Sequence, residues 1–82
     1  MVKRFAAETT AELEFLARFD LGSLLNGIKV HHEAPADVID AAERLFGKGL
    51  VTQADGGYLT DRGVEAAEAL DRALNLLGIE KA

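Results

Sequence analysis

The feature that most constrains this chain is a short turn, Asp55-Gly56-Gly57, set between two short apolar segments. The segments run over residues 50–54 and 58–60, and each is too short to form a helix of ordinary length. Consecutive glycines adopt positive φ without strain, which a tight reversal between two antiparallel strands requires. The turn therefore predicts a two-stranded β-hairpin over residues 50–60.

Helical patterns lie on both sides of this hairpin. Residues 35–47 begin with Pro35, which suits the first position of a helix, and are followed by a glycine stop around Lys48. The apolar residues of this segment recur at helical spacing: Val38, Ile39, Ala42, Leu45 and Phe46. Beyond the hairpin, Thr60 is a suitable N-cap for a last helix over residues 60–77.

The N-terminal part is predicted to hold a loose arm over residues 1–8 and a helix over residues 9–19. Thr9 and Glu12 have the spacing of a capping box, in which each side chain bonds to the other residue's backbone N–H. Residues 22–27 suggest a short helical turn, and the alternation around Ile28 and Val30 is typical of a strand. Residues 9–78 are expected to form one domain, because a chain of 82 residues has room for a single small core.

Two segments resemble parts of winged helix-turn-helix regulators. The run Pro35-x-x-Val38, Leu45 and then Lys48-Gly-Leu-Val is similar to a recognition helix followed by the first strand of a wing. The run Gly57-Tyr-Leu-Thr-x-x-Gly is similar to the return strand and the start of the next helix. The resemblance implies a mainly α fold with a small β-hairpin, of the winged helix-turn-helix type.

A narrower resemblance extends over residues 9–75. The pattern FDL…GIKVH…RLF.KGL.TQ.DGGYLTD.G.EAAE resembles a family of short, functionally uncharacterised bacterial proteins, often labelled DNA-binding proteins or transcriptional regulators. One departure concerns residues 26–32, "NGIKVHH", which stand where a winged helix-turn-helix has its supporting helix. That helix is either short or replaced by a strand that pairs with the wing.

The resemblance implies a regulator that binds double-stranded DNA, with residues 35–48 in the major groove. Arg44 and Lys48 are the expected anchors, and Arg62 lies at the base of the wing. The basic candidates for the DNA contact are Lys29, His31, His32, Arg44, Lys48 and Arg62.

The charge pattern favours an alternative. The formal net charge is −5, and the face of the presumed recognition helix opposite its apolar stripe has one base, Arg44, and three acids, Asp37, Asp40 and Glu43. Phosphates repel such a face, so the alternative is an acidic adaptor that contacts another protein. The last helix also has a broad apolar arc, which predicts a homodimer interface formed by Ala66, Leu70, Ala73, Leu74 and Leu77.

Several kinds of site have little support. The chain has no cysteine, and the adjacent His31 and His32 diverge on either a helix or a strand, so no metal site is predicted. Ser23 is the only serine and no glycine-rich phosphate loop occurs, so neither enzymatic activity nor a cofactor is expected. No apolar run is long enough to span a membrane, and acids interrupt the start of the chain where a signal peptide would be apolar. The sequence therefore predicts a cytoplasmic protein that does not bind membranes.

Overall fold

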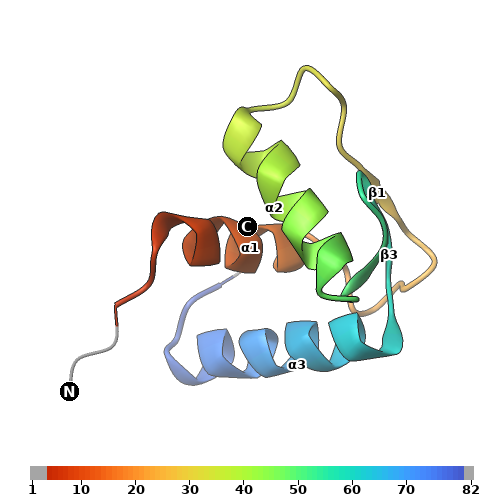
Figure 1. The fold of residues 1–82 in the computed structure, drawn as a ribbon. Helices are drawn as coiled ribbons and strands as arrows, with labels where there is room; N and C mark the ends of the chain where they lie inside the picture. Colours follow the sequence, from red (N-terminus) through yellow and green to blue (C-terminus); the bar gives the residue numbers. More distant parts are fainter. Residues whose placement is uncertain (1–3, 81–82) are drawn as a thin grey trace.

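The computed structural model describes residues 4–80 and places three helices around a small antiparallel sheet (Figure 1). The elements follow in the order α1 (Ala7–Leu16), β1 (Ile28–Lys29), α2 (Ala36–Gly47), β2 (Val51–Gln53), β3 (Gly56–Leu59) and α3 (Asp61–Leu76). The mainly α fold with a small hairpin is confirmed. It is winged-helix-like, since α2 leads directly into the hairpin and the hairpin leads directly into α3.

The sheet has β3 in the centre, with β1 on one side and β2 on the other, and all neighbours are antiparallel. In the register of β1 with β3, Ile28 lies opposite Gly57. Beyond β1, the Val30 N–H donates a hydrogen bond of 2.8 Å to the Asp55 carbonyl, which extends the pairing to the wing tip. The strand alternative for residues 26–32 is therefore confirmed: a strand pairs with the wing where the supporting helix would be.

Residues 22–27 were expected to form a short helix or a turn, and the short helix does not form. This segment forms two successive turns, in which the Ser23 N–H bonds to the Asp20 carbonyl and the Asn26 N–H bonds to the Ser23 carbonyl. The Asp20 carboxylate also accepts the Gly22 N–H at 2.8 Å. Such a local side-chain bond competes with helical pairing and explains the turns. Over residues 17–35, all of them described, the chain has no helix that could pair with α2 as a helix-turn-helix.

The predicted start of the first helix is also wrong. Helix α1 begins at Ala7 with Ala6 as its N-cap and ends at Leu16, against the predicted 9–19. Thr9 lies within the helix, and Ala6 provides no side-chain cap, so the capping box with Glu12 is not formed. The predicted arm over residues 1–8 is correspondingly shorter, and residues 1–3 of it lie outside the described residues.

The two later helices agree closely with prediction. Pro35 was predicted as the first residue of the helix and is instead its N-cap, so α2 begins one residue later, at Ala36. Helix α2 ends at Gly47, as expected. The Thr60 hydroxyl caps α3 by accepting the Gly63 N–H at 3.0 Å. Helix α3 ends at Leu76, one residue before the predicted end, and Gly78 follows it with a φ of +74°.

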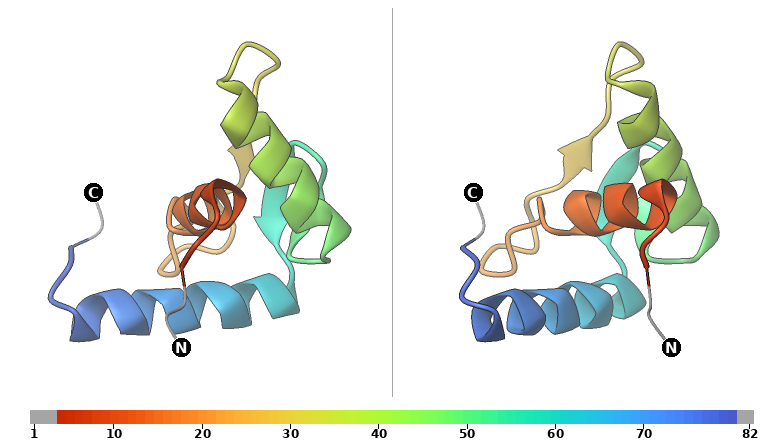
Figure 2. Two further views of the ribbon diagram at one scale, coloured as in Figure 1. Left: turned by 60° about the vertical axis from the view of Figure 1, so that its left-hand side comes forward. Right: turned by 90° about the vertical axis from the view of Figure 1, so that its left-hand side faces the viewer.

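The core lies where α1, α2 and the hairpin meet. Its buried members are Phe15, Leu16, Phe19, Ala42, Leu45 and Val51. Helix α1 packs against both α2 and α3, as the two views of Figure 2 show. Phe19 lies beyond the end of α1 but is still buried, with its ring edge-on to that of Phe15 at 5.8 Å between centroids. This packing turns one face of α2 toward the core and leaves the opposite face in solvent.

Candidate interaction surface

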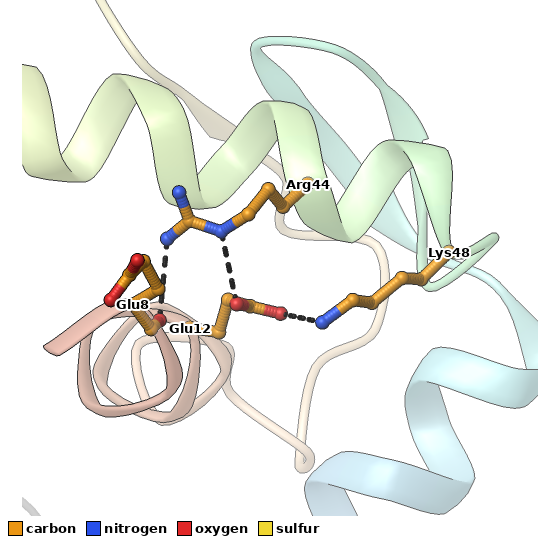
Figure 3. Close-up of polar contacts among 4 residues, drawn as sticks. All are labelled: Glu8, Glu12, Arg44 and Lys48. Carbon is orange, nitrogen blue, oxygen red and sulfur yellow. Dashed lines mark hydrogen bonds and ion pairs between the residues drawn. The ribbon is translucent and has the colours of Figure 1, made fainter. Parts of the chain in front are cut away.

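An ion-pair cluster joins α1 to α2, and Glu12 is its centre (Figure 3). The Glu12 side chain is only 10% exposed, and it accepts a hydrogen bond of 3.0 Å from Arg44 Nε. Its other oxygen accepts a hydrogen bond from Lys48 Nζ. Arg44 also donates to the Glu8 carbonyl at 3.2 Å. One buried carboxylate of α1 thus binds both cations that the sequence predicted as DNA anchors.

The protonation of Glu12 depends on these contacts. Burial by itself raises the pKa of the Glu12 carboxyl, because a charged group loses hydration in the protein interior. The hydrogen bonds and positive charges of Lys48 and Arg44 outweigh burial and hold the pKa below its ordinary value of 4.5. Glu12 is therefore ionised at neutral pH, and its charge stabilises the folded state.

We expect this ion pair to make stability depend on acid pH. Because the Glu12 pKa is lower in the folded than in the unfolded state, its contribution is complete above pH 4.5 and is lost as the pH falls through the folded-state value. Urea unfolding between pH 3 and pH 7 should show the wild type losing more stability than Glu12→Gln, so that the two curves converge in acid. Parallel curves would show that Glu12 does not contribute in this way.

The predicted basic residues do not form a single patch. Arg44 and Lys48 lie on the α1 side of α2 and are bound to Glu12. Arg62, in the first turn of α3, lines a separate hollow beside Leu50. The remaining three lie on β1 and the chain that follows it: Lys29, His31 and His32.

The predicted acidic residues are all exposed on α2 and are spread around its solvent side, at intervals of three in the sequence. Asp37 and Asp40 are nearest the start of α1, where they line a hollow with Arg44, and Glu43 is nearest the chain after β1. The core side of the same helix is formed by Ala41, Ala42 and Leu45, each at most 1% exposed. We call Asp37, Asp40 and Glu43 the acidic face.

The residues predicted for a dimer interface fall into two groups. Ala66 and Leu70 pack against the core of their own chain. Leu74 is half-buried, whereas Ala73 and Leu77 are exposed, and Leu76 beside them is 79% exposed. Of the five predicted interface residues, the two that are exposed thus lie toward the C-terminal end of α3.

Two features of this surface were missed from the sequence. One is the role of Glu12, whose burial could have been predicted from its spacing. It lies three residues before Phe15 and four before Leu16, both buried, and therefore on the apolar stripe of α1. The other is a groove of about 430 Å³ between α2, the chain after β1 and the wing tip. Glu43 and Asp55 both line it, and these two residues come from different elements and share no sequence pattern.

Within residues 4–80, no group of three or more His, Cys, Asp or Glu side chains has an arrangement that could hold a metal ion. In the same part of the chain, no helix is both long enough and apolar enough to cross a membrane.

Comparison with known proteins assigns the chain to a family without assigning a function. No curated protein and no solved structure matches it. One family model, described as a family of unknown function (DUF5669), matches residues 3–78 and so spans nearly the whole chain. The protein belongs to the DUF5669 family.

Proposed function

We propose that this protein is a small winged-helix-like adaptor that contacts a basic surface of another protein through its acidic face. One observation carries the proposal. The helix in the position of a recognition helix has Asp37, Asp40 and Glu43 in solvent, while Glu12 binds its Arg44 and Lys48.

Electrostatics favours a protein partner over DNA for this surface. Affinity for duplex DNA comes largely from cations that displace the counterions condensed on the phosphates. Arg44 on α2 and Lys48 directly after it are both bound to the buried Glu12 carboxylate, so a DNA contact would have to compete with existing ion pairs. A basic protein surface has the complementary charge, and such complementarity accelerates association and selects partners.

DNA binding is the second candidate function, and a protein with this function would be a transcriptional regulator. It is supported by the connection of α2 to a hairpin wing and by the position of Lys29, His31 and His32 near the wing tip. In this case the contact would use β1 and the wing, because Arg44 and Lys48 are bound to α1. Self-association through α3 has weaker support, since Ala66 and Leu70 pack within their own chain.

The proposal is tested by NMR titration of the ¹⁵N-labelled protein with an arginine- and lysine-rich peptide and, separately, with duplex DNA at about 50 mM salt. We expect the peptide to shift amide signals of residues 36–47 and the DNA to shift none. Asp37→Asn/Asp40→Asn/Glu43→Gln should weaken peptide binding about tenfold or more, if each exposed charge contributes up to about 1 kcal/mol.

A matched control removes three exposed acids elsewhere on the surface. Glu14→Gln/Glu65→Gln/Glu68→Gln changes the net charge equally but leaves α2 intact. If both triple variants bind the peptide equally weakly, the contact is nonspecific and the proposal is wrong. Saturable shifts with duplex DNA, centred on β1 and the wing, would support the second candidate instead.

A further inference from the structure

We propose that the groove beside the acidic face seats an arginine side chain of the partner protein, held by Glu43 and Asp55. The inference rests on the proposed function and adds to it the place and the chemistry of the main contact.

The groove has three walls that come from different parts of the chain. Helix α2 supplies Ile39 and Glu43, which are four residues apart and therefore on one side of the helix. The chain after β1 supplies Val30, and the wing tip supplies Ala54 and Asp55. The volume of about 430 Å³ is at the small end of the range for binding pockets, roughly 300–1,000 Å³. It suits one long side chain better than a large ligand.

The shape of the groove is largely preformed. The Val30 N–H donates to the Asp55 carbonyl at 2.8 Å, which ties the wing tip to the chain after β1. Behind the wing tip, Gly56 lies so close to β1 that an added Cβ would be 2.5 Å from the Ile28 carbonyl oxygen. A binding partner therefore meets two walls already held together, which reduces the entropy lost on association.

The lining matches the two parts of an arginine side chain. Val30, Ile39 and Ala54 offer an apolar surface for the aliphatic stem. Glu43 and Asp55 offer carboxylates for the guanidinium, whose planar fork of donors can bond to acceptors on two sides. The ammonium of lysine lacks this fork and would satisfy the two carboxylates less well.

The lining also contains three other polar residues. Lys29, His31 and His32 belong to the wall formed by β1 and the chain after it. With neutral histidines, two carboxylates and one ammonium leave the lining with a net charge of −1. The two carboxylates attract a cationic head, and Lys29 repels it. Because Glu43 belongs both to this groove and to the acidic face, the two surfaces are continuous.

The experiment uses a capped pentapeptide, Gly-Arg-Ala-Arg-Gly, titrated into the ¹⁵N-labelled full chain. We expect amide shifts centred on Val30, Glu43, Ala54 and Asp55. Asp55→Asn should weaken binding about threefold to fivefold, as for the loss of one partly exposed charge pair, whereas Glu68→Gln should change it less than twofold. Asparagine is well tolerated in turns, so the Asp55 variant should keep the hairpin. The peptide with both arginines replaced by lysine should bind more weakly.

Asp55 lies outside the acidic face, so the two proposals can fail separately. Shifts confined to residues 36–40, with Asp55→Asn and Glu68→Gln binding alike, would overturn the groove and leave the adaptor proposal standing. An absence of saturable shifts anywhere would overturn both. Groove signals that respond to duplex DNA and not to the peptide would overturn the assignment of a protein partner.

Discussion

Replacing Gly63 by alanine is expected to lower the free energy of unfolding by about 3 kcal/mol or more, as overpacking against rigid neighbours does. A Cβ at this position would lie 1.9 Å from the Leu50 carbonyl oxygen and 3.1 Å from a methyl carbon of Leu59. The carbonyl cannot turn away at low cost, because it accepts the Thr60 N–H at 3.1 Å. The Thr60 hydroxyl in turn donates to the Gly49 carbonyl, so α3 is held firmly against the corner between α2 and β2.

This prediction separates local from tertiary effects. Gly63 is helical, and alanine is favoured over glycine in a helix by about 1 kcal/mol, so propensity alone predicts stabilisation. The matched control is Gly47→Ala at the end of α2, where an added Cβ meets no atom within 4 Å and should stabilise by about 0.5–1 kcal/mol. Urea unfolding of both variants shows whether each substitution raises or lowers the free energy of unfolding. A Gly63→Ala protein as stable as the wild type would refute the close packing of α3 on the corner.

Replacing Glu12 by alanine is expected to lower the free energy of unfolding by about 2–3 kcal/mol. Breaking a fully buried ion pair typically costs about 3–5 kcal/mol. The value here is smaller because Lys48 is 56% exposed and Arg44 is 33% exposed, so water can hydrate both cations once Glu12 is removed. For a domain of this size such a loss should lower the Tm by about 10 °C or more.

The control for Glu12 is an exposed acid on the same helix. Glu14→Ala should change stability by no more than about 0.5 kcal/mol, because surface substitutions away from specific contacts have small effects. If the Glu12→Ala and Glu14→Ala variants had the same Tm, the ion-pair cluster would contribute nothing measurable to the packing of α1 on α2. The replacement of all three charged groups by methionine should be less damaging than Glu12→Ala, because apolar packing then takes the place of the ion pairs and no cavity is left.

The acidic face and the ion-pair cluster were predictable to different extents. The exposure of Asp37, Asp40 and Glu43 follows from their position opposite the apolar stripe of α2, so the periodicity of one helix was sufficient. Arg44 and Lys48 were predicted to contact DNA, because helical periodicity places Arg44 on the exposed face and does not reveal the residue that binds both cations. That residue, Glu12, lies 32 and 36 residues away in the sequence. Its spacing from Thr9 also matched a local capping motif that does not form.

The features that could be predicted are those set by residues close together in the chain: the ends of α2, the cap of α3 by Thr60 and the reversal at Gly56 and Gly57, where φ is +114° and +75°. Each depends on a proline ring, a hydroxyl or a missing Cβ acting on its own backbone. Two other features depend on tertiary contacts: Ile28 and Lys29 form a strand, and Glu12 binds both Arg44 and Lys48. In both cases the stabilising partner is distant in the sequence, since β3 supplies the backbone bonds of β1, and Arg44 and Lys48 supply the charges that make a buried Glu12 favourable.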